Sequence, residues 1–195
     1  MRTFKSICLL WLSFFLFSGC TESDLFTSDM DGKLKGCSND DIKTVTVPFK
    51  VDFIGEYTSV VTPGSEEGCE DIFQCHVHVD FRGEGTHLGK FTGYFKFCAC
   101  GPEGLYGPTE SLMVAANGDT LFVSCQGRVV AGRQEDHPEH VKNYWRDPFV
   151  ILGGTGRFEG ATGSGYTDDY NSTLDPNSHH HWRGSITLIK GRGKS

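Results

Sequence analysis

The stretch from Val150 to Tyr166, VILGGTGRFEGATGSGY, constrains the fold of this chain more than any other. It starts as a short apolar strand and passes directly into a glycine-rich turn. A turn of this kind can belong to a nucleotide-binding loop or to a tight corner of an all-β barrel. The choice between these two interpretations decides the fold class.

The residues that follow the first glycines argue against nucleotide binding. Gly154, Gly156 and Gly160 resemble a G-x-G-x-x-x-G variant of the dinucleotide fingerprint. That fingerprint requires a helix at this point, because the amides of the helix N-terminus bind the pyrophosphate. The next residues are too rich in glycine for a stable helix, and the short remainder of the chain leaves no room for a parallel sheet. We therefore interpret the block as a structural corner made by Gly153, Gly154, Gly156, Arg157, Gly160 and Gly163, with Arg157 and Glu159 bracing it by surface pairing.

Composition supports a single β domain. The chain has 195 residues, among them 25 glycines and 15 phenylalanines, and it lacks long helical periodicity, which favours many short strands. The net charge is −7. A chain with this balance has no basic surface to neutralise phosphates, so we expect no nucleic-acid partner.

Alternation of apolar and polar residues predicts the strands. It is clearest over residues 45–53, 73–81 and 91–97. The segments 112–116 and 120–130 flank Asn117-Gly118, which predicts a hairpin with a type I′ turn. Residues 149–152, 165–170 and 181–190 supply the last strands, and we place His179-His180-His181 in a solvated loop before the final one. About eight strands are enough to close a sheet. We therefore predict an all-β fold, a single eight-stranded antiparallel β-barrel.

The N-terminus has the pattern of a targeting signal. Arg2 and Lys5 precede an apolar run over residues 7–17, and Leu16-Phe17-Ser18-Gly19-Cys20 resembles the lipobox of bacterial lipoproteins. The alternative is an ordinary secretory signal that is cut elsewhere. The lipobox interpretation predicts a signal peptide over residues 1–19, a lipid on Cys20 that anchors the chain to a membrane, and a flexible tether over residues 20–43. Acidic residues close behind Cys20 look like the surface-export signals of some Bacteroidetes lipoproteins, so we expect the outer membrane or cell surface of a bacterium.

Three segments together resemble a known family: Gly85 to Phe91, Ala116 to Thr120, and Gly153 to Gly163. In this order and spacing they are similar to bacterial proteins of the allene oxide cyclase barrel-like group, which are relatives in fold of plant dirigent proteins. The resemblance covers residues 44–190 and leaves a tail over residues 191–195. It implies an eight-stranded antiparallel barrel that forms homo-oligomers. No segment matches the functional residues of the plant enzymes, so their chemistry is not transferred.

Six cysteines besides Cys20 are disulfide candidates in an exported protein: Cys37, Cys69, Cys75, Cys98, Cys100 and Cys125. Cys98 and Cys100 lie on one strand face about 6.6 Å apart, which is near the limit for a mutual bridge. We therefore expect bridges from Cys98 or Cys100 to the loop cysteines Cys37 and Cys69, and the connectivity stays open. A metal site of Cys98 and Cys100 with His76 and His78 is the alternative. Its spacing is not that of a zinc knuckle, so we predict no metal and no cofactor.

Polar strand residues give a candidate pocket at the barrel mouth, with His76, His78, His87, Tyr94, Arg128 and Asp147 as its members. They form no recognisable catalytic triad or acid pair, so no catalytic residue is assigned.

Two functional hypotheses follow. The first is a lipid-anchored, exported barrel that binds a small apolar or carbohydrate ligand, or a surface partner, without chemistry. The second is an isomerase or cyclase of the allene oxide cyclase-like barrel family. A continuous cavity with an ionisable group at its base would favour the second hypothesis. A fully packed interior would exclude a pocket altogether and leave a structural or adhesive surface protein.

Overall fold

The computed structural model describes residues 42–62 and 69–191. The predicted signal peptide, Cys20, the tether up to residue 41, Cys37 and the last four residues of the tail lie outside these ranges. Among the helices in the described ranges, none is long and apolar enough to cross a membrane.

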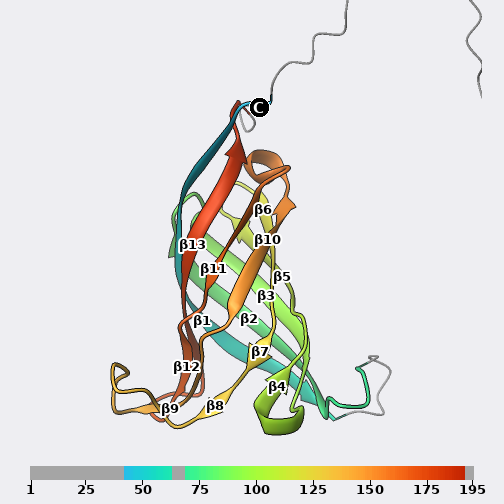
Figure 1. The fold of residues 1–195 in the computed structure, drawn as a ribbon, viewed down its shortest axis with the longest axis vertical. Coiled ribbons are helices and arrows are strands. Elements are labelled where there is room, and N and C mark those ends of the chain that lie inside the picture. The colour runs from blue at the N-terminus through green and yellow to red at the C-terminus, as the bar shows by residue number, and fades with distance from the viewer. Residues whose placement is uncertain (1–41, 63–68, 192–195) are drawn as a thin grey trace, which may run out of the picture. The chain divides into compact units, whose positions relative to one another are not determined.

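Eight antiparallel strands form a closed ring (Figure 1). In ring order they are β1 (Thr44–Val61), β2 (Cys75–Gly85), β3 (Gly89–Ala99), β5 (Glu110–Ala115), β6 (Thr120–Cys125), β10 (Pro148–Gly154), β11 (Thr162–Tyr166) and β13 (Ser178–Ile189). The last strand pairs with the first from Thr44 opposite Ile189 to Gly55 opposite Ser178. The predicted all-β, eight-stranded antiparallel barrel is confirmed, and its closure leaves no edge in the main ring.

Short elements extend one end of this ring. The strands are β4 (Leu105–Tyr106), β7 (Gly127–Arg128), β8 (Val130–Ala131), β9 (Val141–Trp145) and β12 (Asp169–Ser172), and the 3-10 turns are η1 (Pro102–Gly104) and η2 (Gly156–Phe158). β12 pairs with the first residues of β13, and β9 and β8 follow it outward. β4 pairs with β7. Because successive strands alternate in direction, the described connections 69–74, 100–109, 126–140 and 173–177 all lie at this end, together with the short elements within them. We call it the wide end.

Strand alternation builds the core. On β1 the inward residues Phe49, Val51 and Phe53 are buried, while their neighbours along the strand are exposed. The ring of Phe53 lies 4.9 Å from that of Phe81 and 5.8 Å from that of Phe95. Each such side chain contributes about 1.5–3 kcal/mol on burial. Many of the phenylalanines in the sequence therefore pack against one another inside the barrel.

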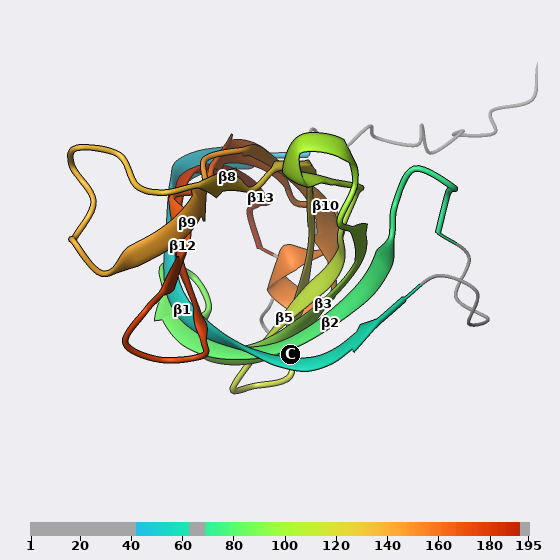
Figure 2. The ribbon, with the colours of Figure 1, turned by 90° about the horizontal axis from the view of Figure 1, so that it is seen from below.

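The three segments that carry the family resemblance meet at the opposite, narrow end. Arg157 Nε lies 2.7 Å from Asp119 Oδ2, and its Nη1 donates to the carbonyl of His87 at 3.0 Å. Phe158, in η2, is fully buried, and Figure 2 shows η2 across the far end of the ring. Arg157 thus braces the corner through Asp119 of the neighbouring turn, and a 3-10 turn replaces the helix that a nucleotide site would need.

Three local predictions are wrong. Gly118 has φ +89°, but Asn117 is not among the residues with positive φ. The bonds between Ala115 and both Gly118 and Asp119 therefore define a type I turn with a following left-handed glycine rather than type I′. The predicted strand 165–170 is split into β11 and β12. The histidine triplet lies inside β13 rather than in a loop.

Gly156 allows a test of the narrow end. It has φ +56°, and a Cβ there would lie 1.9 Å from Asp119 Oδ1. Gly156→Ala therefore has two costs: the strained backbone conformation, and the displacement of Asp119 from Arg157. Gly89→Ala is the matched control, because Gly89 has φ +65° and nothing within 4 Å of the added Cβ. We expect Gly156→Ala to lower the denaturation midpoint clearly more than Gly89→Ala. Equal losses would contradict the proposed bracing.

Candidate functional site

The barrel interior is hollow at the wide end. The cavity there has a volume of about 300 Å³. Its walls are mainly apolar and carry six aromatic side chains: Tyr57, Phe95, Phe97, Tyr106, Trp145 and Trp182. A barrel of eight strands has room for one small ligand, and this cavity is at the lower end of the range seen for ligand pockets.

A buried carboxylate, Asp169, lies in the wall of this cavity. Its side chain is 1 % exposed. Oδ2 accepts a hydrogen bond from the indole Nε1 of Trp182 at 3.0 Å, and Oδ1 accepts one from the backbone amide of His181 at 3.1 Å. Two residues, Thr167 and Asp168, interrupt the sheet between β11 and β12, and Asp169 follows this interruption on the buried side. The two donors satisfy part of the demand that burial of a carboxylate creates.

An imidazole, that of His180, lies beside the carboxylate. His180 is 4 % exposed, and its ring stacks on Phe53 with centroids 4.4 Å apart. Nδ1 lies 2.9 Å from Asp169 Oδ2, but the angle is not that of a hydrogen bond, so we treat this contact as electrostatic. Nε2 lies 2.8 Å from Ser178 Oγ. Asp169, His180 and Ser178 therefore form one buried polar cluster.

The absence of a side chain at Gly55 makes room for this cluster. A Cβ at Gly55 would lie 2.6 Å from Ser178 Oγ and 3.2 Å from His180 Nε2. Ser178 Oγ also donates to the Gly55 carbonyl at 3.3 Å. These positions are cross-strand neighbours, because β1 and β13 pair Gly55 with Ser178 and Phe53 with His180.

A second polar group borders the cavity. Tyr106 donates from its hydroxyl to Asp147 Oδ2 at 2.9 Å. Burial raises the pKa of Asp147, the negative charge of Asp169 raises it further, and the hydrogen bonds from Tyr106 and the Arg128 amide oppose both effects. Burial also raises the pKa of Tyr106 far above its usual range and that of the reduced thiol of Cys125 to about 12. Cys125 is therefore a protonated, weakly nucleophilic part of the wall.

Two disulfides stabilise the neighbouring strands. Cys69 is bonded to Cys98, and Cys75 is bonded to Cys100. The expected bridge from this strand to the loop cysteine Cys69 is confirmed at Cys98. Cys100 pairs instead with Cys75, on the adjacent strand β2. Both cysteines of the alternative metal site are thus unavailable as thiolate ligands. In residues 42–62 and 69–191 no cluster of metal-binding side chains is found.

None of the six predicted pocket residues lines this cavity. His76, His78 and Tyr94 are on the outer faces of β2 and β3, because Val77, Val79 and Phe95 take the inner positions. His87 lies in the β2–β3 turn, and Arg128 is exposed at the rim of the wide end. Asp147 accepts a hydrogen bond from Tyr106 but does not itself line the cavity. The prediction took polar strand positions as pocket residues. In a barrel with an apolar interior, most polar strand positions face outward, so the prediction selected outer-surface residues.

Sequence reasoning missed the cluster on β12 and β13. Trp182 is fully buried, and counting back from it by twos places His180 and Ser178 on the same inner face. That alternation was a usable signal. The inward turn of Asp169 has no such signal, because it depends on the interruption between β11 and β12.

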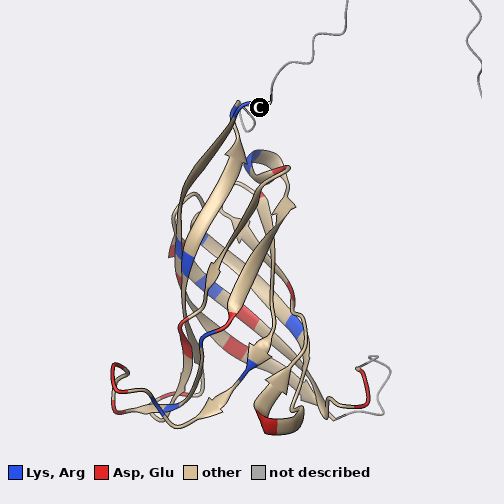
Figure 3. Cartoon of the chain, viewed as in Figure 1, with Lys and Arg blue, Asp and Glu red and all other residues tan. Residues whose placement is uncertain are grey.

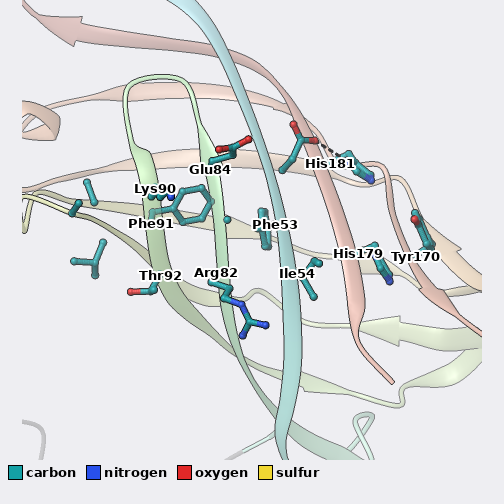
Figure 4. Close-up of a pocket in the computed structure, with 15 residues that line it drawn as sticks. Phe53, Ile54, Arg82, Glu84, Lys90, Phe91, Thr92, Tyr170, His179 and His181 are labelled. Carbon is teal, nitrogen blue, oxygen red and sulfur yellow. Dashed lines mark hydrogen bonds and ion pairs between the residues drawn. The ribbon is translucent and has the colours of Figure 1, made fainter. Parts of the chain in front are cut away.

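A second depression, on the outer face of the barrel, has a volume of about 780 Å³. Figure 4 shows Ile54, Arg82, Glu84 and Lys90 along it. Its charged groups are partly matched within the wall: Asp52 Oδ1 lies 2.7 Å from His181 Nδ1 and 2.6 Å from Arg183 Nη2. Because this groove is more open to solvent than the interior cavity, the interior cavity is the better candidate for a binding site.

Comparisons with known proteins identify the fold. No protein-family model matches the sequence, and no curated protein matches it. A solved structure of a pterocarpan synthase dirigent protein is similar, with a TM-score of 0.50 and 17% identity over 76% of this chain and 93% of that chain. A protein of unknown function from Clostridium acetobutylicum is more distant, with a TM-score of 0.42 and 8% identity over 74% of this chain and 99% of that one. The first likeness shows a dirigent-type barrel fold and nothing finer.

Removal of the Asp169 carboxylate tests its structural role. Asp169→Ala leaves the buried indole N–H of Trp182 and the amide of His181 without their acceptors, and each unmet donor costs about 1–3 kcal/mol. We expect the free energy of unfolding to fall by about 2–4 kcal/mol, measured by chemical denaturation. Asp169→Asn keeps an acceptor oxygen and is expected to lose less. A loss within error for the alanine variant would contradict the described contacts.

Proposed function

We propose that this protein binds one small, largely apolar molecule inside the wide end of its barrel. The interior cavity carries the proposal, because it combines six aromatic side chains with a buried polar cluster. Apolar walls supply affinity, and a few fixed polar groups orient the ligand. The dirigent-type fold is compatible with such a role. Mainly apolar walls favour an apolar ligand over a carbohydrate.

An isomerase or cyclase is the second candidate. It is favoured by the ionisable pair Asp169 and His180, 2.9 Å apart in the cavity wall. An imidazole beside a carboxylate can pass a proton between two positions of a bound molecule, which is the minimum chemistry of an isomerase. A binding protein releases its ligand unchanged, whereas an isomerase releases an isomer of it. Extraction of the ligand that copurifies from the native host, followed by NMR before and after incubation with fresh protein, separates them: an unchanged ligand supports binding alone, and an isomer supports catalysis.

We also propose that the mature chain is lipid-anchored through Cys20 at the outer membrane or cell surface of a bacterium. The lipobox-like pattern before Cys20 and the polar segment after it support this proposal. Mass spectrometry of the mature N-terminal peptide from the native host is expected to show a diacylglyceryl modification on Cys20. An unmodified Cys20, or a mature chain that starts elsewhere, would refute the anchor.

Ligand binding is testable with a neutral aromatic probe, 2-naphthalenemethanol. We expect saturable binding that changes the fluorescence of Trp145 and Trp182, because both rings line the cavity. Val129→Phe narrows the same cavity and is expected to weaken binding at least tenfold. Val150→Phe is the matched control, since Val150 lies on the outer face of β10 and is 45% exposed. Equal binding by both variants would place the probe outside the barrel and refute the proposal.

A further inference from the structure

The charge around the interior cavity has one sign apart from a single histidine. Among the described residues that line it, Asp169 is the only carboxylate, and none is lysine or arginine. Asp147 adds a second carboxylate just behind Tyr106. His180 is the one lining group that can carry a positive charge. The hydrogen bonds that Asp169 accepts come from a neutral indole and a neutral amide.

The negative charge of Asp169 acts on groups from several elements around the cavity. The pKa of Tyr57 is raised by burial and further by Asp169. The pKa of Cys125 and that of Asp147 are likewise raised by burial and by the same carboxylate. These residues come from β1, β6 and the β9–β10 junction. A potential that disfavours further negative charge at all three positions favours a positive charge between them.

The aromatic rings around Asp169 have the composition of a cation-binding cage. The ring of Trp145 lies 5.8 Å from that of His180, and the indole of Trp182 is bonded to Asp169. Tyr57, Phe95 and Tyr106 are further rings of the wall. A cation over an aromatic face gains about 0.5–2 kcal/mol, and tryptophan is the strongest of these partners. Cages of aromatic rings are a usual means of recognising quaternary ammonium groups, and a neighbouring carboxylate adds Coulomb attraction.

The rim of the wide end is acidic as well. The described loops 69–74, 100–109, 126–140 and 173–177 contain two arginines, Arg128 and Arg133, and seven acidic residues: Glu70, Asp71, Glu103, Glu135, Asp136, Glu139 and Asp175. Figure 3 shows acidic residues on several of these loops. Arg128 is itself paired with Glu103, and Arg146, at the β9–β10 junction of the same end, is paired with Asp136 and Asp168. An acidic mouth raises the local concentration of cations and disfavours entry of anions.

We propose that the interior cavity selects a small organic cation, a quaternary ammonium or a protonated amine with an apolar body. The positive group lies among the rings beside Asp169, and the apolar body contacts the remaining wall. This inference rests on the proposed binding function and names the chemical class of its ligand.

Three molecules of nearly equal shape and different charge test the inference. They are choline, its neutral carbon isostere 3,3-dimethylbutan-1-ol, and the anion 3,3-dimethylbutanoate, each titrated into the folded barrel by calorimetry and by tryptophan fluorescence. We expect choline to bind at least tenfold more tightly than the neutral isostere, and the anion to show no binding. Equal or tighter binding of the neutral isostere, or no binding of choline, would overturn the inference.

Variants locate the selectivity. Asp169→Asn is expected to reduce choline affinity about tenfold and to change that of the neutral isostere less than twofold. Asp80→Asn removes a carboxylate on the outer face of β2 and is the matched control, expected to change neither. Trp145→Leu is the second variant should the Asn variant fail to fold, and it is expected to weaken choline more than the isostere. Choline affinity that survives both cavity variants would overturn the inference.

The outcomes also separate this inference from the binding function. If 2-naphthalenemethanol binds and choline shows no advantage over its isostere, the cavity is a binding site without charge selection, and only the present inference fails. If none of the probes binds, both fail.

Discussion

The antiparallel pairing of β1 with β13 is the constraint on which the rest of the structure depends. It joins the first strand of the barrel to the last, from Thr44 opposite Ile189 to Gly55 opposite Ser178. Without it the eight strands would form an open sheet with two exposed edges. The same pairing assembles the site, because it brings Phe53 against His180 and Gly55 against Ser178. The same strand pairing therefore both closes the barrel and assembles the site. It joins residues more than 120 positions apart in the chain.

The two ends of the barrel serve different purposes. Arg157, Asp119 and the His87 carbonyl close the narrow end, where the glycine-rich block allows the chain to turn tightly and Phe158 to fill the interior. At the wide end, Gly55 leaves room for Ser178 and His180, and aromatic rings surround a space that they do not fill. The glycine-rich block is thus a structural plug at the end opposite the candidate site.

Much of the fold was predictable from the sequence, and little of the site was. Alternation predicted the strands, because it reports directly which strand face is buried, and the Val150–Tyr166 block predicted a tight corner of a barrel. The site depends on which polar residues turn inward. Polar residues on the outer faces of β2 and β3 outnumber those inside, so a search for polar strand positions selected His76 and Tyr94. His180 was assigned to a loop because a run of histidines resembles a solvated segment, although its spacing from Trp182 marks it as inward. Asp169 depends on the break between β11 and β12, which has no local sequence signature.

The wide end of the barrel holds a mainly apolar cavity beside Asp169, and the proposed function depends on this space. A crystal structure determined under xenon pressure tests it most directly, because xenon occupies apolar cavities and leaves packed interiors empty. We predict xenon density in the space that Trp145, Trp182 and Phe95 line, with the Asp169 carboxylate still bonded to the Trp182 indole. A barrel whose wide end is filled by its own side chains, with no xenon inside, would contradict it.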